Sequence, residues 1–174
     1  ILPGADFWAG GPEVSYDAEK FLTENSEFKG VMVGEGEETF KELAGHYVEK
    51  NPQNLKNMTG ICYRDGDQII HNGWRQIMDL SSIPFIYKDL SEFKNRIIYY
   101  ESSRGCPFSC AYCLSSIDKK LRFRSLDLVL PELEWFLQAK VPQVKFVDRT
   151  FNCKKSHAMA IWQYIRDHDN GVTN

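Results

Sequence analysis

Three of the five cysteines in this 174-residue chain lie close together, at Cys106, Cys110 and Cys113. Thiolates are soft ligands that bind zinc or iron–sulfur clusters. A cubane iron–sulfur cluster usually takes four cysteines, so a cluster held by these three would keep one iron open to a small molecule. The alternative is a zinc site, which would need a fourth protein ligand. The next cysteine along the chain, Cys153, is far from the other three in sequence.

Short apolar segments must position this cysteine loop. Residues 97–100 form an apolar run before it, and residues 144–147 form a second run after it. Between them, residues 126–137 carry apolar side chains at helical spacing, and a further helix follows at about residue 158. Strand, helix, strand and helix in this order predict parallel strands joined by right-handed crossovers.

The two helices of this half have different boundary signals. Ser125 is expected to cap the first one. Pro131 fits a helix interior badly, so this helix either starts near Pro131 or is kinked there. Asn152 is expected to cap the second helix, and Gly171 to end it.

The first half also has an α/β pattern. The apolar run at residues 5–9 leads into Gly10 and Gly11, and a second buried strand at residues 30–34 precedes a helix. The acidic stretch at residues 35–38 lies at the positive end of that helix, which favours carboxylates.

A β-hairpin is predicted between residues 60 and 71. Asp65-Gly66 is a strong signal for a two-residue turn. With this turn, Arg64 and Asp67 would face each other across the strands as a favourable pair.

Composition narrows the function classes. The chain is 43% apolar and 26% charged, with a net charge of −3, as in ordinary globular proteins, and the charge gives no reason to expect nucleic acid. No apolar run is long enough to span a membrane, and no signal peptide is recognisable. An odd number of cysteines, three of them clustered, indicates a reducing compartment, so we expect the cytoplasm. Both ends read as internal, which suggests a piece of a longer protein.

The spacing Cys-x-x-x-Cys-x-aromatic-Cys, with Tyr112 as the aromatic, resembles the signature of the radical S-adenosylmethionine (SAM) enzymes. Residues 100–110 and 144–152 resemble the branch that carries an N-terminal cobalamin-binding domain. The resemblance implies that Cys106, Cys110 and Cys113 hold a [4Fe–4S] cluster and that SAM chelates its fourth iron. It further implies that an electron from the cluster cleaves SAM to methionine and a 5′-deoxyadenosyl radical.

The resemblance also assigns cofactor contacts. Tyr112 corresponds to a residue whose backbone lies beside the adenine, and Phe108 to an apolar residue that covers the cluster. Asp148 is the nearest match to the residue that holds the amino group of SAM, although the usual Gly-Gly-Glu motif is missing there. From the residues alone, Tyr112 could equally pack in a core, and Asp148 could equally be a turn or cap carboxylate.

Gly10 and Gly11 resemble a glycine pair that packs against the nucleotide tail of cobalamin, where a missing side chain permits close approach. A tight strand-to-helix turn is the alternative. The family motif Asp-x-His-x-x-Gly fits none of the four histidines, so the sequence leaves cobalamin binding open. Residues 34–37 also match this branch without indicating a role.

The sequence therefore predicts an α/β protein in three parts. Residues 1–78 are the C-terminal part of a Rossmann-like cobalamin-binding domain with a hairpin, 79–95 a linker, and 96–174 the start of a (β/α) radical SAM barrel. The resemblance implies an enzyme that acts on a small molecule or cofactor precursor, with flavodoxin or ferredoxin as electron donor; the piece alone is expected to be inactive. The alternatives are a radical SAM enzyme without cobalamin and a non-catalytic iron–sulfur or zinc interaction module.

Overall fold

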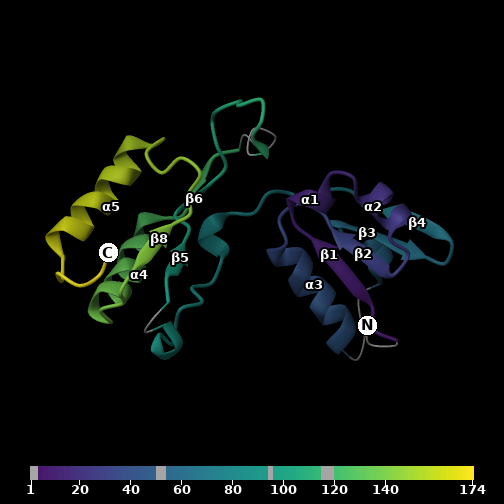
Figure 1. Ribbon diagram of the computed structural model, residues 1–174, viewed down its shortest axis with the longest axis horizontal. Helices are drawn as coiled ribbons and strands as arrows, with labels where there is room; N and C mark the ends of the chain where they lie inside the picture. Colours follow the sequence, from purple (N-terminus) through teal and green to yellow (C-terminus); the bar gives the residue numbers. More distant parts are fainter. Residues whose placement is uncertain (1–3, 50–53, 94–95, 115–119) are drawn as a thin grey trace. The chain divides into compact units, whose positions relative to one another are not determined.

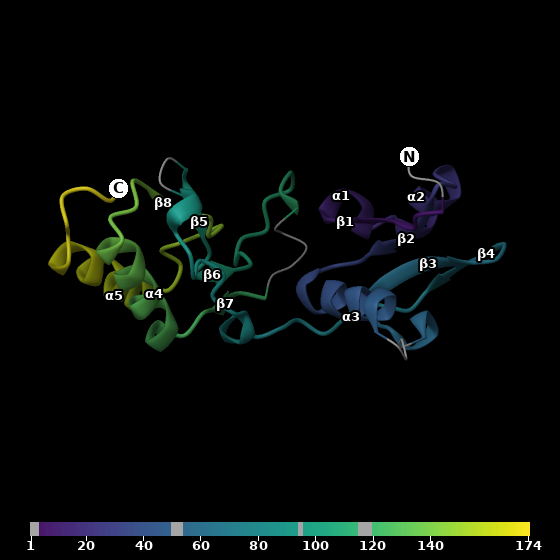
Figure 2. The same ribbon diagram turned by 90° about the horizontal axis from the view of Figure 1, so that it is seen from below.

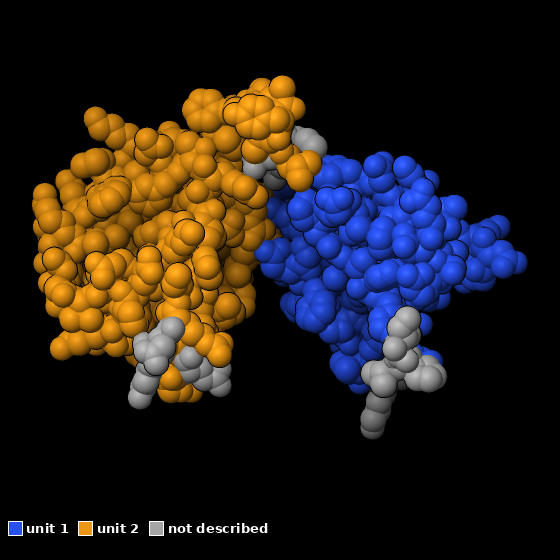
Figure 3. All heavy atoms as spheres, viewed as in Figure 1, with its two compact units in different colours: residues 1–77 blue, residues 78–174 orange. Residues whose placement is uncertain are grey.

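The computed structural model describes residues 4–49, 54–93, 96–114 and 120–174. The chain divides into two compact units, residues 1–77 and residues 78–174 (Figures 1 and 3). Each unit combines helices with β-strands, so the predicted α/β class is confirmed. Among the described residues, no helix has the length and apolar character needed to cross a membrane.

A four-stranded sheet forms the centre of the first unit. Its strands run in the order β1-β2-β3-β4; β1 and β2 are parallel, and the other two pairs are antiparallel. In chain order the elements are β1 (Phe7–Gly10), α1 (Pro12–Ser15), α2 (Ala18–Glu24), β2 (Phe28–Met32), α3 (Glu37–Val48), the 3-10 turn η1 (Leu55–Asn57), β3 (Ile61–Asp65) and β4 (Gln68–His71).

Helices cover both faces of this sheet (Figure 2). Successive side chains of a strand point to opposite faces. Accordingly, Cys62 packs with Leu22 of α2, whereas its neighbour Tyr63 packs with Leu43 of α3. The Cys62 thiol is completely buried, and this burial raises its pKa to about 11. Cys62 therefore stays protonated near neutral pH and serves as a small apolar core residue.

The β3–β4 hairpin is present, but its predicted register is wrong by one residue. Asp65 pairs with Gln68, so Gly66 and Asp67 form the turn, and Arg64 faces Ile69 rather than Asp67. Gly66 adopts a positive φ of 60°, which a glycine tolerates best. Because Gly66 is the first residue of the turn, the turn lies one residue later than the Asp65-Gly66 signal suggested.

The second unit is built around a parallel pair of strands. Strand β5 pairs with β8, with Ile98 opposite Val144, and the short strands β6 and β7 form an antiparallel ribbon. The predicted order of strand, helix, strand and helix is confirmed. The elements are η2 (Leu80–Ser82), η3 (Ser91–Phe93), β5 (Ile98–Tyr100), β6 (Ser103–Arg104), β7 (Arg122–Phe123), α4 (Leu126–Gln138), β8 (Val144–Phe146) and α5 (Lys155–Asp167).

The starts of α4 and α5 decide between the alternatives that the sequence left for these two helices. Ser125 caps α4 as predicted, because its hydroxyl accepts a hydrogen bond from the Asp127 N–H at 3.3 Å. Pro131 lies inside the helix, so the alternative of a start near Pro131 is wrong. The prediction that Asn152 caps α5 is also wrong, since that helix begins only at Lys155.

The segment expected to be a linker packs onto the second unit. Phe85, Tyr87, Leu90 and Phe93 lie against the cluster of buried residues around Phe136. The Trp135 indole of α4 donates a hydrogen bond to the Tyr87 carbonyl oxygen at 2.8 Å. These residues therefore contribute to the core of the second unit.

A buried ion pair between Arg124 and Glu132 connects residues 80–83, at the start of this segment, to α4. The guanidinium of Arg124 contacts both carboxylate oxygens of Glu132, at 2.5 and 3.0 Å, and it also donates to the carbonyl oxygens of Leu80 and Ile83. The Tyr100 hydroxyl donates to the same carboxylate at 2.5 Å. Burial, together with the Glu132 bond, raises the pKa of Tyr100, so the phenol stays a donor. Both charges are thus paired and hydrogen-bonded.

Candidate cluster and cofactor site

The cysteine loop extends from the β6–β7 ribbon. Ser103 pairs with Phe123 and Arg104 with Arg122. Directly after this ribbon, Gly105 has a φ of +93°, and a Cβ placed on it would lie only 2.5 Å from the Lys120 carbonyl oxygen, just before β7. Only glycine fits such a conformation and such a close approach. Gly105 thus sets the point at which the loop leaves the ribbon.

The three loop cysteines differ in exposure. Cys110 is exposed, whereas Cys106 and Cys113 are half-buried, and none of the three forms a disulfide. The Cys113 N–H donates to the Cys110 carbonyl oxygen at 3.1 Å. The Cys106 sulfur lies 3.3 Å from the Thr150 hydroxyl oxygen. In the part of the chain that the structure describes, no three His, Cys, Asp or Glu side chains stand in a metal-binding arrangement.

The two aromatic residues of the loop point to solvent. Tyr112 is 94% exposed and Phe108 is 58% exposed. The alternative that Tyr112 packs in a core is therefore wrong within this chain. Neither ring is committed to the core of its own unit, so both are available to a bound group.

The Asp148 carboxylate ties the end of β8 to the end of β5. Ser102 donates its backbone N–H to Oδ1 at 2.8 Å and its hydroxyl to Oδ2 at 2.6 Å, and the Ser103 hydroxyl donates to Oδ2 at 2.8 Å. Both serines are buried. These bonds support the structural alternative for Asp148. A carboxylate has about four acceptor sites, so a contact with SAM stays a prediction.

Substituting Asp148 separates its two predicted roles. Asp148→Ala leaves buried donors of Ser102 and Ser103 unpaired, so we expect the second unit to lose about 2–4 kcal/mol of stability, measured by hydrogen exchange of its amides. Asp167→Ala removes a carboxylate from an exposed ion pair and is the matched control, expected to cost under about 1 kcal/mol. Equal costs for the two variants would contradict the structural role.

Asp148→Asn tests the SAM contact, because an amide can retain the bonds to the two serine hydroxyls while losing the charge. If Asp148 holds the SAM amino group, we expect SAM affinity to fall about tenfold to hundredfold. An unchanged affinity would remove Asp148 from the cofactor contacts and leave only its structural role.

Glycines lie at or just beyond the ends of the parallel strands of the first unit: β1 ends at Gly10, and Gly34 follows two residues after the end of β2. Gly10 pairs with Met32, and Gly11 follows with a φ of +99° at the start of α1. A Cβ added to Gly11 would meet no heavy atom within 4 Å, so this backbone faces open space. The buried Ser15 hydroxyl donates to the Gly11 carbonyl oxygen at 2.7 Å and accepts from the Gly34 N–H at 3.3 Å. The tight turn is confirmed, and cobalamin contact stays a prediction.

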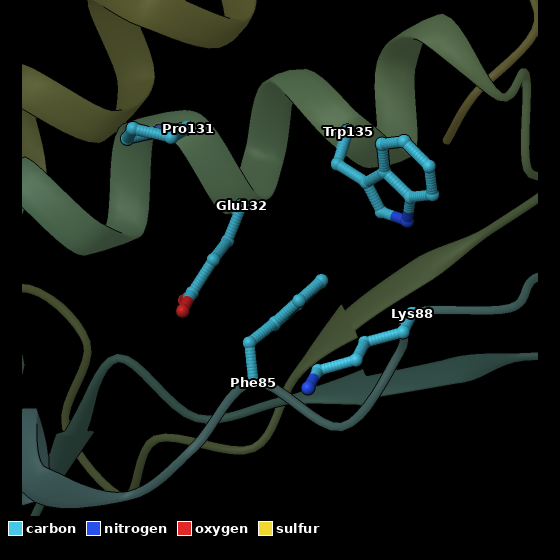
Figure 4. Close-up of a pocket in the computed structure, with 5 residues that line it drawn as sticks. All are labelled: Phe85, Lys88, Pro131, Glu132 and Trp135. Atoms are coloured by element: carbon cyan, nitrogen blue, oxygen red, sulfur yellow. The ribbon is translucent and has the colours of Figure 1, made fainter.

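A separate hollow of about 370 Å³ lies between α4 and the segment before β5 (Figure 4). Phe85 and Lys88 come from the segment, and Pro131, Glu132 and Trp135 come from the helix. None of the predicted cofactor residues lines it. The site residues therefore belong to the cysteine loop, the end of β8 and the glycine turn.

The chain is similar to several curated proteins, although no family profile matches it. It is 31% identical over 162 residues to the uncharacterized methyltransferase PH0819 of Pyrococcus horikoshii, which covers 87% of this chain and 35% of that protein. It is 25% identical over 170 residues to the cobalamin-dependent radical SAM methyltransferase TokK of Streptomyces tokunonensis, which covers 87% of this chain and 25% of TokK.

Solved structures share the fold. The cobalamin-dependent SAM radical enzyme OxsB, with aqua-cobalamin and SAM bound, superposes with a TM-score of 0.68 at 21% identity, over 92% of this chain and 24% of OxsB. The resemblance to cobalamin-binding radical SAM proteins is confirmed. The methyltransferase TsrM from Kitasatospora setae, with cobalamin and a [4Fe–4S] cluster bound, gives a TM-score of 0.66 at 19% identity, over 96% of this chain and 35% of TsrM.

The chain spans about a third of PH0819 and of TsrM, and about a quarter of TokK and OxsB. Both units lie within the part that matches, because OxsB and TsrM each cover more than nine-tenths of the chain. The activity of the whole radical SAM protein is therefore a matter of proposal.

The thiols of the loop fit, by their chemistry, a [4Fe–4S] cluster such as the one bound in TsrM. Cys106, Cys110 and Cys113 are three soft donors on one short loop, a set that leaves one iron of a cubane without a protein ligand. Cys62 does not belong to the set, since its thiol is buried in the other unit with a raised pKa. Cluster assembly would have to draw the three thiols together.

Sequence reasoning missed two residues of this site. Ser102 anchors the carboxylate at the end of β8, and Thr150 contacts the first loop cysteine. Each lies more than forty positions from its partner, so no local pattern pairs them. The run of small polar residues before the loop was the one available signal, because buried serines need hydrogen-bond partners.

Proposed function

We propose that Cys106, Cys110 and Cys113 bind a [4Fe–4S] cluster whose fourth iron takes SAM, and that the protein cleaves SAM reductively. The observation that carries this proposal is the three-thiol loop leaving the β6–β7 ribbon at Gly105, next to the ends of β5 and β8. Ligands of parallel α/β folds bind at the carboxyl ends of the strands. The similarity to the radical SAM methyltransferase TokK and to the methyltransferase PH0819 supports the same function.

The residues of this chain divide the work of binding. The three thiolates would hold the cluster, and the Phe108 ring would cover it and exclude water. The backbone at Tyr112 would lie beside the adenine, and Asp148 would hold the SAM amino group with its remaining acceptor site. When bound, the cluster supplies the electron that splits SAM into methionine and a 5′-deoxyadenosyl radical.

We further propose that the first unit contributes to a cobalamin site at Gly10 and Gly11. Its support is the open backbone at Gly11 and the cobalamin bound in OxsB and TsrM. With cobalamin, the reaction would be methyl transfer to, or rearrangement of, a small-molecule or cofactor-precursor substrate. A cytoplasmic flavodoxin or ferredoxin would supply the electrons. A radical SAM enzyme without cobalamin is the second candidate, since the chain lacks Asp-x-His-x-x-Gly.

Metal analysis of the protein that contains this chain tests the cluster. After anaerobic reconstitution we expect iron and acid-labile sulfide in equal amounts, with an absorbance that oxygen bleaches. Stoichiometric zinc without sulfide would instead support the interaction module.

Gly11→Val tests the cobalamin proposal. A side chain at Gly11 would occupy the space proposed for the nucleotide tail, so we expect cobalamin binding to weaken at least about tenfold. The positive φ strains any substitution there, so Gly73→Val is the matched control: Gly73 has a φ of +81° and equally open surroundings.

Cobalamin retention after gel filtration, read from its visible absorbance, gives the result. Both glycine variants should lose some stability and keep the cluster, and only Gly11→Val should lose cobalamin. If wild-type protein retains no cobalamin, or if both variants lose it equally, the first unit does not bind cobalamin at Gly11.

A further inference from the structure

The segment after β8 holds the first cysteine of the loop. The Thr150 hydroxyl oxygen lies 3.3 Å from the Cys106 sulfur, within hydrogen-bonding range for sulfur. Two residues earlier, Asp148 accepts three hydrogen bonds from Ser102 and Ser103, which stand just before the loop. One short stretch of chain therefore contacts the base of the loop twice.

Further hydrogen bonds hold the backbone that carries Thr150. The Thr150 carbonyl oxygen accepts a hydrogen bond from the Cys153 N–H at 3.2 Å, which turns the chain toward α5. On the other side, the Asp148 carboxylate is held by Ser102, which is completely buried. The backbone on either side of Thr150 is thus held by hydrogen bonds that do not involve Cys106.

The direction of the Thr150–Cys106 hydrogen bond depends on the state of the sulfur. In a free thiol, either the sulfur or the hydroxyl can donate. A metal-bound cysteine is a thiolate, which carries no proton and can only accept. Thr150 would then have to donate. A hydrogen bond to a cluster sulfur stabilises the reduced, more negative cluster and raises its reduction potential.

We propose that Thr150 is a positioning residue that presets Cys106 for cluster binding and, by donating a hydrogen bond to its thiolate, raises the reduction potential of the cluster. The inference rests on the proposed cluster at Cys106, Cys110 and Cys113. Thr150 lies outside the cysteine motif, and it would act through the cluster ligand Cys106 rather than by contacting SAM.

The test compares three variants of the protein that contains this chain, by redox titration of the reconstituted cluster followed by electron paramagnetic resonance. Thr150→Val keeps the shape and removes the donor, so its midpoint potential should shift to a more negative value. Thr150→Ser keeps the donor and should stay near wild type. Thr173→Val is the control, because that hydroxyl lies in the same unit and accepts its hydrogen bond from Asn170.

Each outcome decides the inference. A Thr150→Val potential equal to that of wild type, with a full cluster, would overturn the tuning role. If Thr150→Val loads no cluster while Thr150→Ser does, the hydroxyl is needed to place Cys106, which supports the positioning role. If Thr150→Ser also loads no cluster, the hydroxyl does not place Cys106, and the positioning role is overturned. Absence of any cluster in the wild type would instead overturn the proposed function itself.

Discussion

Replacing Cys106, Cys110 or Cys113 by Ala is expected to abolish the iron–sulfur cluster. Each variant leaves only two thiolates on the loop, and two protein ligands leave two irons of a cubane exposed. The expected result is loss of the iron, of the acid-labile sulfide and of the visible absorbance after anaerobic reconstitution. A variant that still binds the cluster, even in lower yield, would contradict this prediction.

The two remaining cysteines provide controls in the same chain. Cys153→Ala changes a half-buried thiol that lies outside the loop, and Cys62→Ala changes the buried thiol of the first unit. Both variants should retain wild-type iron and sulfide, although Cys62→Ala should cost some stability through the cavity that it leaves. If the cluster is retained in Cys110→Ala but lost in Cys153→Ala, then Cys153 rather than Cys110 is a ligand of the cluster.

Replacing Arg124 by Met is expected to destabilise the second unit by about 3–5 kcal/mol, because it leaves the buried Glu132 carboxylate without its cation. The substitution also removes the donor that holds the carbonyl oxygens of Leu80 and Ile83. A loss of this size is a large fraction of the stability of an ordinary domain. Amide hydrogen exchange in α4 measures it for this unit alone.

Two further variants show whether the buried pair is the cause. Arg166→Met makes the same change in an exposed ion pair with Asp167 and should cost under about 1 kcal/mol. The double variant Arg124→Met, Glu132→Leu removes both charges, so it should be more stable than Arg124→Met alone. If Arg124→Met proves no worse than Arg166→Met, the pair does not stabilise the unit.

The elements that sequence reasoning located well are those with a local signal. The apolar runs before the cysteine loop and after α4 became β5 and β8, and they pair in parallel. Ser125 caps α4, because a side-chain oxygen next to the first helical turn needs no distant partner. Gly11 turns the chain between β1 and α1 as the glycine pair suggested.

The features that sequence reasoning missed depend on partners far along the chain. Nothing near Arg124 indicates that it binds the carbonyl oxygens of the segment before β5, so that segment read as a linker. The hairpin register shifted by one residue because the backbone at Gly66, rather than the Asp-Gly pair, sets the turn. For Pro131 the sequence left two alternatives, and the structure shows the one in which α4 runs through the proline.

At the candidate site, the sequence predicts the ligands and the fold shows what supports them. The spacing of Cys106, Cys110 and Cys113 predicts a thiolate metal site. The choice of a [4Fe–4S] cluster over zinc came from the resemblance to radical SAM enzymes. The contacts of Asp148 and Thr150 appear only when the ends of β5 and β8 come together. Residues that act through a ligand have no spacing rule of their own, so a sequence pattern could not reveal them.

The central claim is that the open iron of this cluster binds and cleaves SAM. The most direct test adds SAM to the reduced protein that contains this chain and records its electron paramagnetic resonance spectrum. We expect SAM to change the spectrum of the cluster, and strong reductant then to release 5′-deoxyadenosine and methionine even without substrate. A spectrum that saturating SAM leaves unchanged, with no 5′-deoxyadenosine formed, would contradict the account and leave an electron-transfer or structural cluster.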